Sequence, residues 1–208
     1  ESGLKFFPIY QDGGTTQSDF TAENGQLDGK AAVNAAKALG LPDDTIIYFA
    51  VDFDAMDYQI TSNIIPYFKE VYDEVSSSSA YKVGVYGARN VCSRVSDAGY
   101  AYCSFVGNMS TGFSGNLGFK MPSNWAFDQF GNKDKNGNYL IISSADGNFE
   151  IDKDGVSGRD DGVSWLKEVE ESDAFVSDKI NLGESDEDEL SGPVIDFFGN
   201  EVPLFKLD

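Results

Sequence analysis

The chain has 208 residues, with 35 acidic side chains against 15 basic ones, and it contains no histidine. Its formal net charge of −20 argues against nucleic acid or an anionic membrane surface as a partner, because both would repel it. Without histidine, Ser-His and Cys-His catalysis are excluded and a zinc site is disfavoured, so carboxylates would have to carry any proton transfer. No apolar run reaches the length of about 18 residues that a membrane-spanning helix needs.

Taken in order, the apolar patterns predict strands that alternate with helices. The expected elements are a strand at 4–10, a helix at 24–39, a strand at 46–54, a helix at 58–75 that Pro66 kinks or restarts, a strand at 82–87, a short helix at 88–95, strands at 104–109 and 125–130, and a last strand at 147–152. The glycine-rich stretch at 111–118 predicts a loop, and Asn136-Gly137 predicts a tight hairpin turn.

This alternation predicts βα units and a parallel sheet. Six barrel-type strands are fewer than the eight of a closed barrel, which usually takes about 250 residues. We therefore expect an α/β protein of the TIM-type β/α barrel class that lacks its first two strands in this chain. From residue 150 onward there are 18 acidic residues and 5 basic ones. This shift predicts a partial barrel domain over 1–155 and an acidic linker and tail over 156–208.

Within the tail, the pattern indicates a helix at 162–171 and a hairpin of the apolar segments 194–198 and 202–205. Alternatively, these segments fold back to fill the gap of the missing strands and bring Asp196 to the position of the first strand. The abrupt start at Glu1 suggests an interior cut, so further domains of a larger parent chain are expected partners.

The strand at 46–54 ends in two carboxylates, Asp52 and Asp54. Side chains alternate along a strand, so both acids share one face with Tyr48, and their Cα atoms lie about 6.6 Å apart. Catalytic residues of β/α barrels sit at the carboxyl ends of the strands, and two carboxyl groups in this range can divide acid and base work. The structural alternative is that Asp52 forms a contact inside the barrel and Asp54 caps the next helix.

Four segments, in this order and spacing, resemble one known family: Phe7-Pro8-Ile9-Tyr10-Gln11, the run from Ile47 to Asp54, the run from Val83 to Gly87, and Trp125-Ala126-Phe127-Asp128-Gln129. The family is the glycoside-hydrolase-like domain of unknown function 1906, a distant relative of the family 25 muramidases. The resemblance covers 4–154. It implies a β/α barrel and, in the relatives, hydrolysis of peptidoglycan at N-acetylmuramic acid.

The resemblance also implies site residues. Asp52 and Asp54 look like the catalytic Asp-x-Glu pair of the muramidases, although Asp54 is one methylene shorter than the glutamate there. Such a shortening can cost about 100-fold in rate. The residues expected to contact a sugar are Tyr10, Tyr48, Tyr86, Asn108, Trp125, Gln129 and Asp152. The tyrosines and the tryptophan could instead belong to the core.

The sequence therefore predicts a glycoside hydrolase-like protein that cleaves bacterial cell-wall glycan, or alternatively a non-catalytic barrel that binds carbohydrate. We expect a polysaccharide partner, no cofactor, no metal, no membrane insertion, and an extracellular or wall-associated location. Asn132, Asp134 and Asn136 form only a weak calcium-loop pattern, which a hairpin turn explains better. For Cys92 and Cys103, a small disulfide loop and two reduced core thiols both remain open.

Overall fold

The computed structural model of the protein describes residues 5–144 and 147–164. The acidic run at 184–189, the hairpin expected at 194–205 and the position of Asp196 lie outside the described residues. Most of the helix expected at 162–171 lies outside them too, and its start is wrong, because Val163–Ser164 form a short strand, β10.

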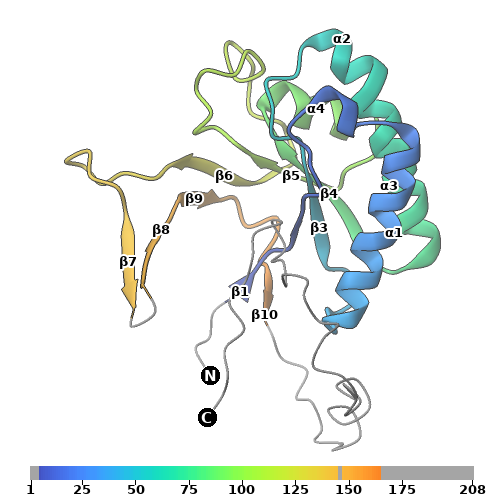
Figure 1. The fold of residues 1–208 in the computed structure, drawn as a ribbon, viewed down its shortest axis with the longest axis horizontal. Helices are drawn as coiled ribbons and strands as arrows, with labels where there is room; N and C mark the ends of the chain where they lie inside the picture. The colour runs from blue at the N-terminus through green and yellow to red at the C-terminus, as the bar shows by residue number, and fades with distance from the viewer. Residues whose placement is uncertain (1–4, 145–146, 165–208) are drawn as a thin grey trace, which may run out of the picture. The chain divides into compact units, whose positions relative to one another are not determined.

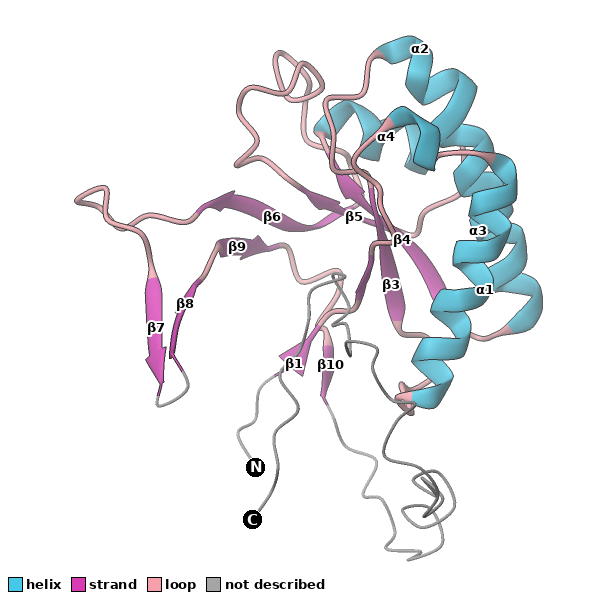
Figure 2. Ribbon diagram, viewed as in Figure 1, coloured by secondary structure: helices cyan, strands magenta, loops and turns pink. Residues whose placement is uncertain are grey.

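A six-stranded sheet organises the described part, in the order β2-β3-β4-β5-β6-β9 (Figures 1 and 2). Its members are β2 (Ile9–Tyr10), β3 (Ile46–Ala50), β4 (Lys82–Gly87), β5 (Cys103–Val106), β6 (Trp125–Gly131) and β9 (Lys153–Val156). All neighbouring pairs are parallel except β6 with β9, which is antiparallel. The expected α/β class with a mostly parallel sheet is therefore confirmed.

Helices cover one face of this sheet (Figure 2). They are α1 (Ala22–Ala38), α2 (Asp57–Gln59), α3 (Ile65–Ser78) and α4 (Arg89–Asp97), with a 3₁₀ turn at Gln17–Asp19 before α1. The Thr21 side chain caps α1 by accepting a hydrogen bond from the Asn24 amide. A π-helical turn (Ile60–Ile64) separates α2 from α3, and Pro66 stands in the first turn of α3, so the predicted restart at this proline is confirmed.

α1 and α3 pack very closely at Gly25. A Cβ atom added there would lie 2.3 Å from the backbone oxygen of Tyr67, far inside van der Waals contact. Only glycine therefore allows the two helix backbones to approach this far. The close approach fixes the helical layer against the sheet.

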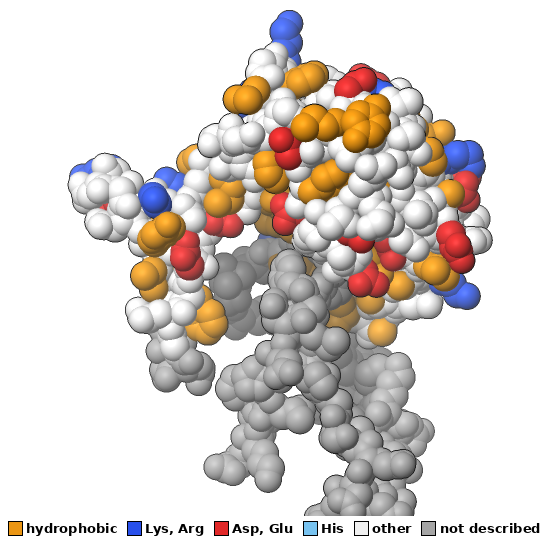
Figure 3. Space-filling view, turned by 45° about the horizontal axis from the view of Figure 1, so that its top comes forward, with side chains coloured by type: hydrophobic (Ala, Val, Ile, Leu, Met, Phe, Trp, Pro, Cys, Tyr) orange, Lys and Arg blue, Asp and Glu red, His pale blue; other side chains and the backbone are white. Residues whose placement is uncertain are grey.

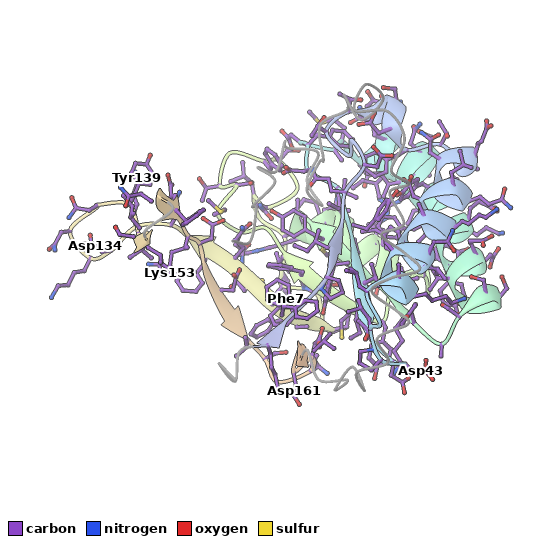
Figure 4. All side chains as sticks on the ribbon, turned by 60° about the horizontal axis from the view of Figure 1, so that its bottom comes forward. Phe7, Asp43, Asp134, Tyr139, Lys153 and Asp161 are labelled. Carbon is purple, nitrogen blue, oxygen red and sulfur yellow. The ribbon has the colours of Figure 1, made fainter. Side chains whose placement is uncertain are left out.

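The two faces of β3 belong to different hydrophobic clusters, as strand alternation predicts. Ile47 and Phe49 face the helices and pack in one cluster with Phe68. Tyr48 faces the other side, where its ring meets those of Phe105 and Phe127 edge to face. Phe7 completes this second cluster at ring centroid distances of 5.1 Å from Phe105 and 4.3 Å from Phe127, and Figure 4 shows it lying over this face of the sheet.

Two strand predictions are wrong. The strand expected at 4–10 is split by Phe7-Pro8 into β1 (Lys5–Phe6), which pairs with β10, and β2, which pairs with β3. The segment 147–152 does not join the sheet, because β8 (Gly147–Glu150) pairs antiparallel with β7 (Ile141–Ser144) in a separate hairpin. The last strand of the sheet is β9, and its antiparallel direction was not expected.

The two cysteines lie on opposite sides of the sheet. Cys92, on α4, belongs to the cluster under the helices, and Cys103, on β5, belongs to the cluster on the other face. Both are free and buried. Of the two alternatives the sequence left open, the reduced thiols are the one found. Burial raises the pKa of Cys103 to about 11.

None of the described helices combines the length and the apolar character that crossing a bilayer requires.

Candidate functional site

The carboxyl ends of β3, β4, β5 and β6 lie along one edge of the sheet, because these strands are parallel. Asp52 follows β3, Tyr86 lies near the end of β4, Asn108 follows β5, and Gln129 lies near the end of β6. Figure 3 brings this part of the molecule forward and shows acidic side chains among exposed hydrophobic ones. Four predicted site residues are thus carried to one edge.

A hydrogen-bonded chain of side chains runs across this edge. The Tyr86 hydroxyl donates to Oε1 of Gln129 over 2.8 Å, and Nε2 of Gln129 donates to Oδ2 of Asp152 over 2.7 Å. Burial, and then the negative charges of Asp52, Asp152 and Asp154, raise the pKa of Tyr86 well above its usual range. The hydroxyl therefore stays protonated, and the carboxylates that act on it come from two segments, one with Asp52 and one with Asp152 and Asp154.

Asp154 is a residue of this edge that was not predicted from the sequence as a catalytic residue or a sugar contact. It pairs across the strands with Gln129, because β9 runs antiparallel to β6. Partial desolvation, followed by the charges of Asp152 and Asp128, raises the pKa of its carboxyl. A signal was present in the sequence, since Asp152-x-Asp154 repeats the spacing of Asp52-x-Asp54.

Asp54 is turned toward a loop. Its Oδ1 accepts hydrogen bonds from the backbone amide and from the hydroxyl of Ser114, both over 2.7 Å. Ser114 lies in the glycine-rich stretch at 111–118, so Asp54 ties this loop to the end of β3. Asp52 is exposed, and its backbone amide donates to the carbonyl of Gly14 over 2.8 Å. The catalytic roles expected for both acids stay predictions.

Asn108 connects a cation to an acid. Its Oδ1 accepts a hydrogen bond of 2.6 Å from Nε of Arg89, and its Nδ2 donates to Oδ1 of Asp128, also over 2.6 Å. The Asp128 charge acts in turn on Asp154. Asn108 is therefore part of the polar network at this edge, and its contact with a sugar stays a prediction.

Three of the expected sugar contacts are placed elsewhere. Tyr10 faces the helical layer, where its ring lies 5.4 Å from that of Phe49 and its hydroxyl donates to Asp28. Tyr48 has no exposed surface, and its hydroxyl donates to Asp160 over 2.8 Å. Trp125 begins β6 and packs against the helix-side cluster, at the opposite end of the strand from Gln129. These three aromatic residues serve the core rather than the edge.

A small cavity of about 150 Å³ lies at the other end of β3. It is lined by residues that precede or start β2, β3 and β10: Pro8, Pro42, Asp43, Asp44, Thr45, Ile46, Asp160, Gly162 and Val163. Figure 4 shows Asp43 and Asp161 at this end, and Asp134, Tyr139 and Lys153 together at the base of the hairpin. Within residues 5–144 and 147–164, no three acidic or cysteine side chains are grouped to hold a metal ion.

The turn at Asn136-Gly137 is formed by local hydrogen bonds. Oδ1 of Asp134 accepts from the backbone amides of Asn136 and Asn138, and Gly137 has a positive φ of 86°. The predicted tight turn is confirmed, and it accounts for the polar residues of the weak calcium-loop pattern.

Comparison with known proteins gives two curated relatives from Bacillus subtilis, both uncharacterized. YbfG is 53% identical over 170 residues, which is 79% of this chain and 22% of that protein. FadG is 43% identical over 184 residues, which is 88% of this chain and 31% of that protein. The chain thus spans about a fifth to a third of the length of these relatives.

Among solved structures, the chain is similar to the Tat-secreted protein Rv2525c of Mycobacterium tuberculosis, crystallised in complex with HEPES. The TM-score is 0.59 at 18% identity, and the match covers 79% of this chain and 72% of the other. This likeness concerns the fold. The sequence model of the Rv2525c-like, glycoside hydrolase-like domain matches residues 1–154. The chain therefore belongs to the Rv2525c-like family of glycoside hydrolase-like domains.

Proposed function

We propose that this domain hydrolyses a glycosidic bond of the bacterial cell-wall glycan with carboxylate groups, on a partial TIM-type β/α barrel. The observation that carries the proposal is the hydrogen-bonded chain from Tyr86 through Gln129 to Asp152 at the carboxyl end of the parallel strands, with Asp154 opposite Gln129 and Asp52 at the end of the neighbouring β3. Glycoside hydrolysis needs one protonated carboxyl group to donate to the leaving oxygen and a second carboxylate across the bond. Three acids around one tyrosine offer both.

Asp154 is the proton donor in this proposal. Its pKa is raised by partial desolvation and by the neighbouring charges of Asp152 and Asp128, so the protonated form persists to higher pH than in an ordinary aspartate. Asp52 supplies the second carboxylate. Asp54 would act indirectly, by keeping the loop of Ser114 in place beside the site.

The proposed substrate and location follow from the family. Its name contains "glycoside hydrolase-like", and the similar mycobacterial protein is Tat-secreted. We therefore place this domain outside the cell or at the wall, with peptidoglycan as its polysaccharide partner. The carboxyl groups alone carry the chemistry, without a cofactor.

Binding without cleavage is the second candidate function. The chain of hydrogen bonds from Tyr86 through Gln129 to Asp152 favours it, because amide and hydroxyl groups in such an arrangement suit the hydroxyls of a sugar. Recognition of this kind requires no proton donor.

The test is the release of reducing ends from purified peptidoglycan by the 208-residue chain and by single variants. Asp52→Asn and Asp154→Asn are expected to lower the rate about 100- to 10,000-fold, because each removes a carboxyl group that takes part in the reaction. Asp97→Asn, on the exposed end of α4, is the matched control and should keep the full rate.

Asp54→Asn distinguishes the two assignments of the donor. If Asp54→Asn lowers the rate about 100- to 10,000-fold while Asp154→Asn keeps the full rate, Asp54 is the donor. A wild type that sediments with peptidoglycan but releases no reducing ends would contradict hydrolysis and support binding without cleavage. A wild type that does neither would overturn both functions.

A further inference from the structure

Arg89 is held rigidly beside the carboxylate edge. It is the first residue of α4 and is half-buried. Its Nε donates to Oδ1 of Asn108 over 2.6 Å, and its Nη1 donates to the carbonyl of Phe119 over 2.9 Å. Two neutral oxygens thus hold the guanidinium group through Nε and Nη1, while Nη2 has no hydrogen-bond partner among the described residues. An arginine has five N–H donors, so part of the group is left for another acceptor.

No carboxylate in the described part of the chain forms an ion pair with Arg89. The ion pairs found there join Lys69 to Glu70 and Asp73, Lys82 to Asp44, and Arg94 to Asp57. Arg94, on the same helix, is paired. Arg89 is not, although the acids of this protein greatly outnumber its bases. Within 5–144 and 147–164, no fully buried side-chain nitrogen lacks a hydrogen bond, so the remaining N–H groups of Arg89 are accessible to solvent.

The position of Arg89 connects it to the proposed active site. Asn108 bridges it to Asp128, and the charge of Asp128 acts on the carboxyl group of Asp154. Arg89 therefore lies at the same edge of the sheet as the three acids. It is a fixed positive charge at the border of a negative cluster.

We propose that Arg89 binds a free carboxylate of the glycan substrate, borne by a sugar or by a peptide attached to it, so that the site selects an acidic glycan. The proposal rests on the function proposed above and names its substrate class. A planar guanidinium group with one side held is prepared for two parallel hydrogen bonds to a carboxylate, which a lysine does not offer.

The electrostatics of the protein also supports recognition of an acidic glycan by Arg89. A protein with a net charge of −20 repels an anionic polymer, and the acids around Tyr86 repel it further at the site itself. An acidic sugar can enter only if a local cation meets its charge. Arg89 is a half-buried cation at this edge with which no described carboxylate pairs directly.

The experiment compares binding of the 208-residue chain to purified peptidoglycan and to the same material with its carboxyl groups methyl-esterified. Wild type is expected to bind the esterified wall about 10- to 100-fold more weakly, the range of a charge-assisted contact. Arg89→Gln should bind untreated wall as weakly as wild type binds the esterified wall. Arg89→Lys should fall in between, because it keeps the charge and loses the fork.

Two controls separate recognition from folding. Arg94→Gln removes a paired arginine of the same helix and should leave both affinities unchanged. If Arg89→Gln merely disturbed the loop that contains Phe119, the variant would also bind the esterified wall more weakly than the wild type does. That result would overturn the proposal. Equal affinities of wild type and Arg89→Gln for untreated wall would overturn it as well, while the proposed function stands.

A soluble pair of ligands tests Arg89 without the wall. N-acetylmuramic acid carries a carboxylate that N-acetylglucosamine lacks, and saturation-transfer NMR reports their binding. Preference for the acid that disappears in Arg89→Gln would support Arg89 even if the wall itself were not bound. If wild type binds neither the wall nor N-acetylmuramic acid, both the proposed function and this inference are wrong.

Discussion

Asp28 is a half-buried acid that takes no part in the proposed chemistry. Its carboxylate accepts hydrogen bonds from Tyr67 over 2.6 Å and from Tyr10 over 3.4 Å. Desolvation raises the pKa of Asp28, the two tyrosines oppose this rise, and the charges of Asp12 and Asp19 add to it. Because the net shift is upward, the folded state holds the proton more tightly than the unfolded state does.

The sign of this shift gives a pH dependence. The stabilisation by the bound proton is fully present below the unfolded pKa of about 3.9 and is lost as the pH rises through the folded pKa. We expect the free energy of unfolding of wild type, relative to Asp28→Asn, to fall as the pH rises above about 4. Urea unfolding at a series of pH values measures this difference. A difference that stays constant or increases with pH would contradict the assignment.

At the scale of elements, the packing of α1 on α3 depends on Gly25. An alanine there would favour the helix by about 1 kcal/mol, but its Cβ would meet the Tyr67 carbonyl at 2.3 Å. Backbone atoms cannot move aside cheaply, so we expect Gly25→Ala to lower the free energy of unfolding by about 1–3 kcal/mol. Urea unfolding checks this. Asn34→Ala, at an exposed position of the same helix, should change stability by less than about 0.5 kcal/mol.

Elements were predictable from sequence where their own residues form an apolar run that is closed on both sides by turn residues. β4 has the predicted bounds, because its apolar run is closed on both sides by turn residues. β9 was missed, since Lys153-Asp154-Gly155-Val156 has little strand character and becomes a strand by pairing with β6. The role proposed for Asp154 was not predicted for the same reason, although the Asp152-x-Asp154 spacing was visible in the sequence. It depends on which residue lies opposite Gln129, and that register is a tertiary property.

Which face a side chain takes was predictable only on long strands. Along β3, the alternation correctly separates Tyr48 from Ile47 and Phe49. The alternation does not show that aromatic rings cover the face on which Tyr48 lies, so that a ligand cannot reach it. β2 has two residues, which is too short for any alternation, so nothing in the sequence indicated that Tyr10 faces the helices.

At the scale of the whole molecule, the order of the parallel strands was predictable because each βα unit is local in sequence. The pairing of β1 with β10 was not, since it joins residues near 5 and near 164 and depends on the whole chain having folded between them. The same holds for the contact of Tyr48 with Asp160. Contacts between residues so far apart in the chain leave no periodic signal in the sequence. Sequence patterns therefore predict the central strands of the sheet better than the strands that pair near its two ends.

The separation of Cys92 and Cys103 by the sheet has a consequence for how the fold is stabilised. They are the only cysteines of the chain, so no internal covalent cross-link holds the fold, and burial alone must stabilise it. We expect the melting temperature to be the same with and without dithiothreitol, as measured by circular dichroism. A drop in the presence of the reductant would show a bridge between them. The fold of the described residues therefore requires no oxidation of these two thiols.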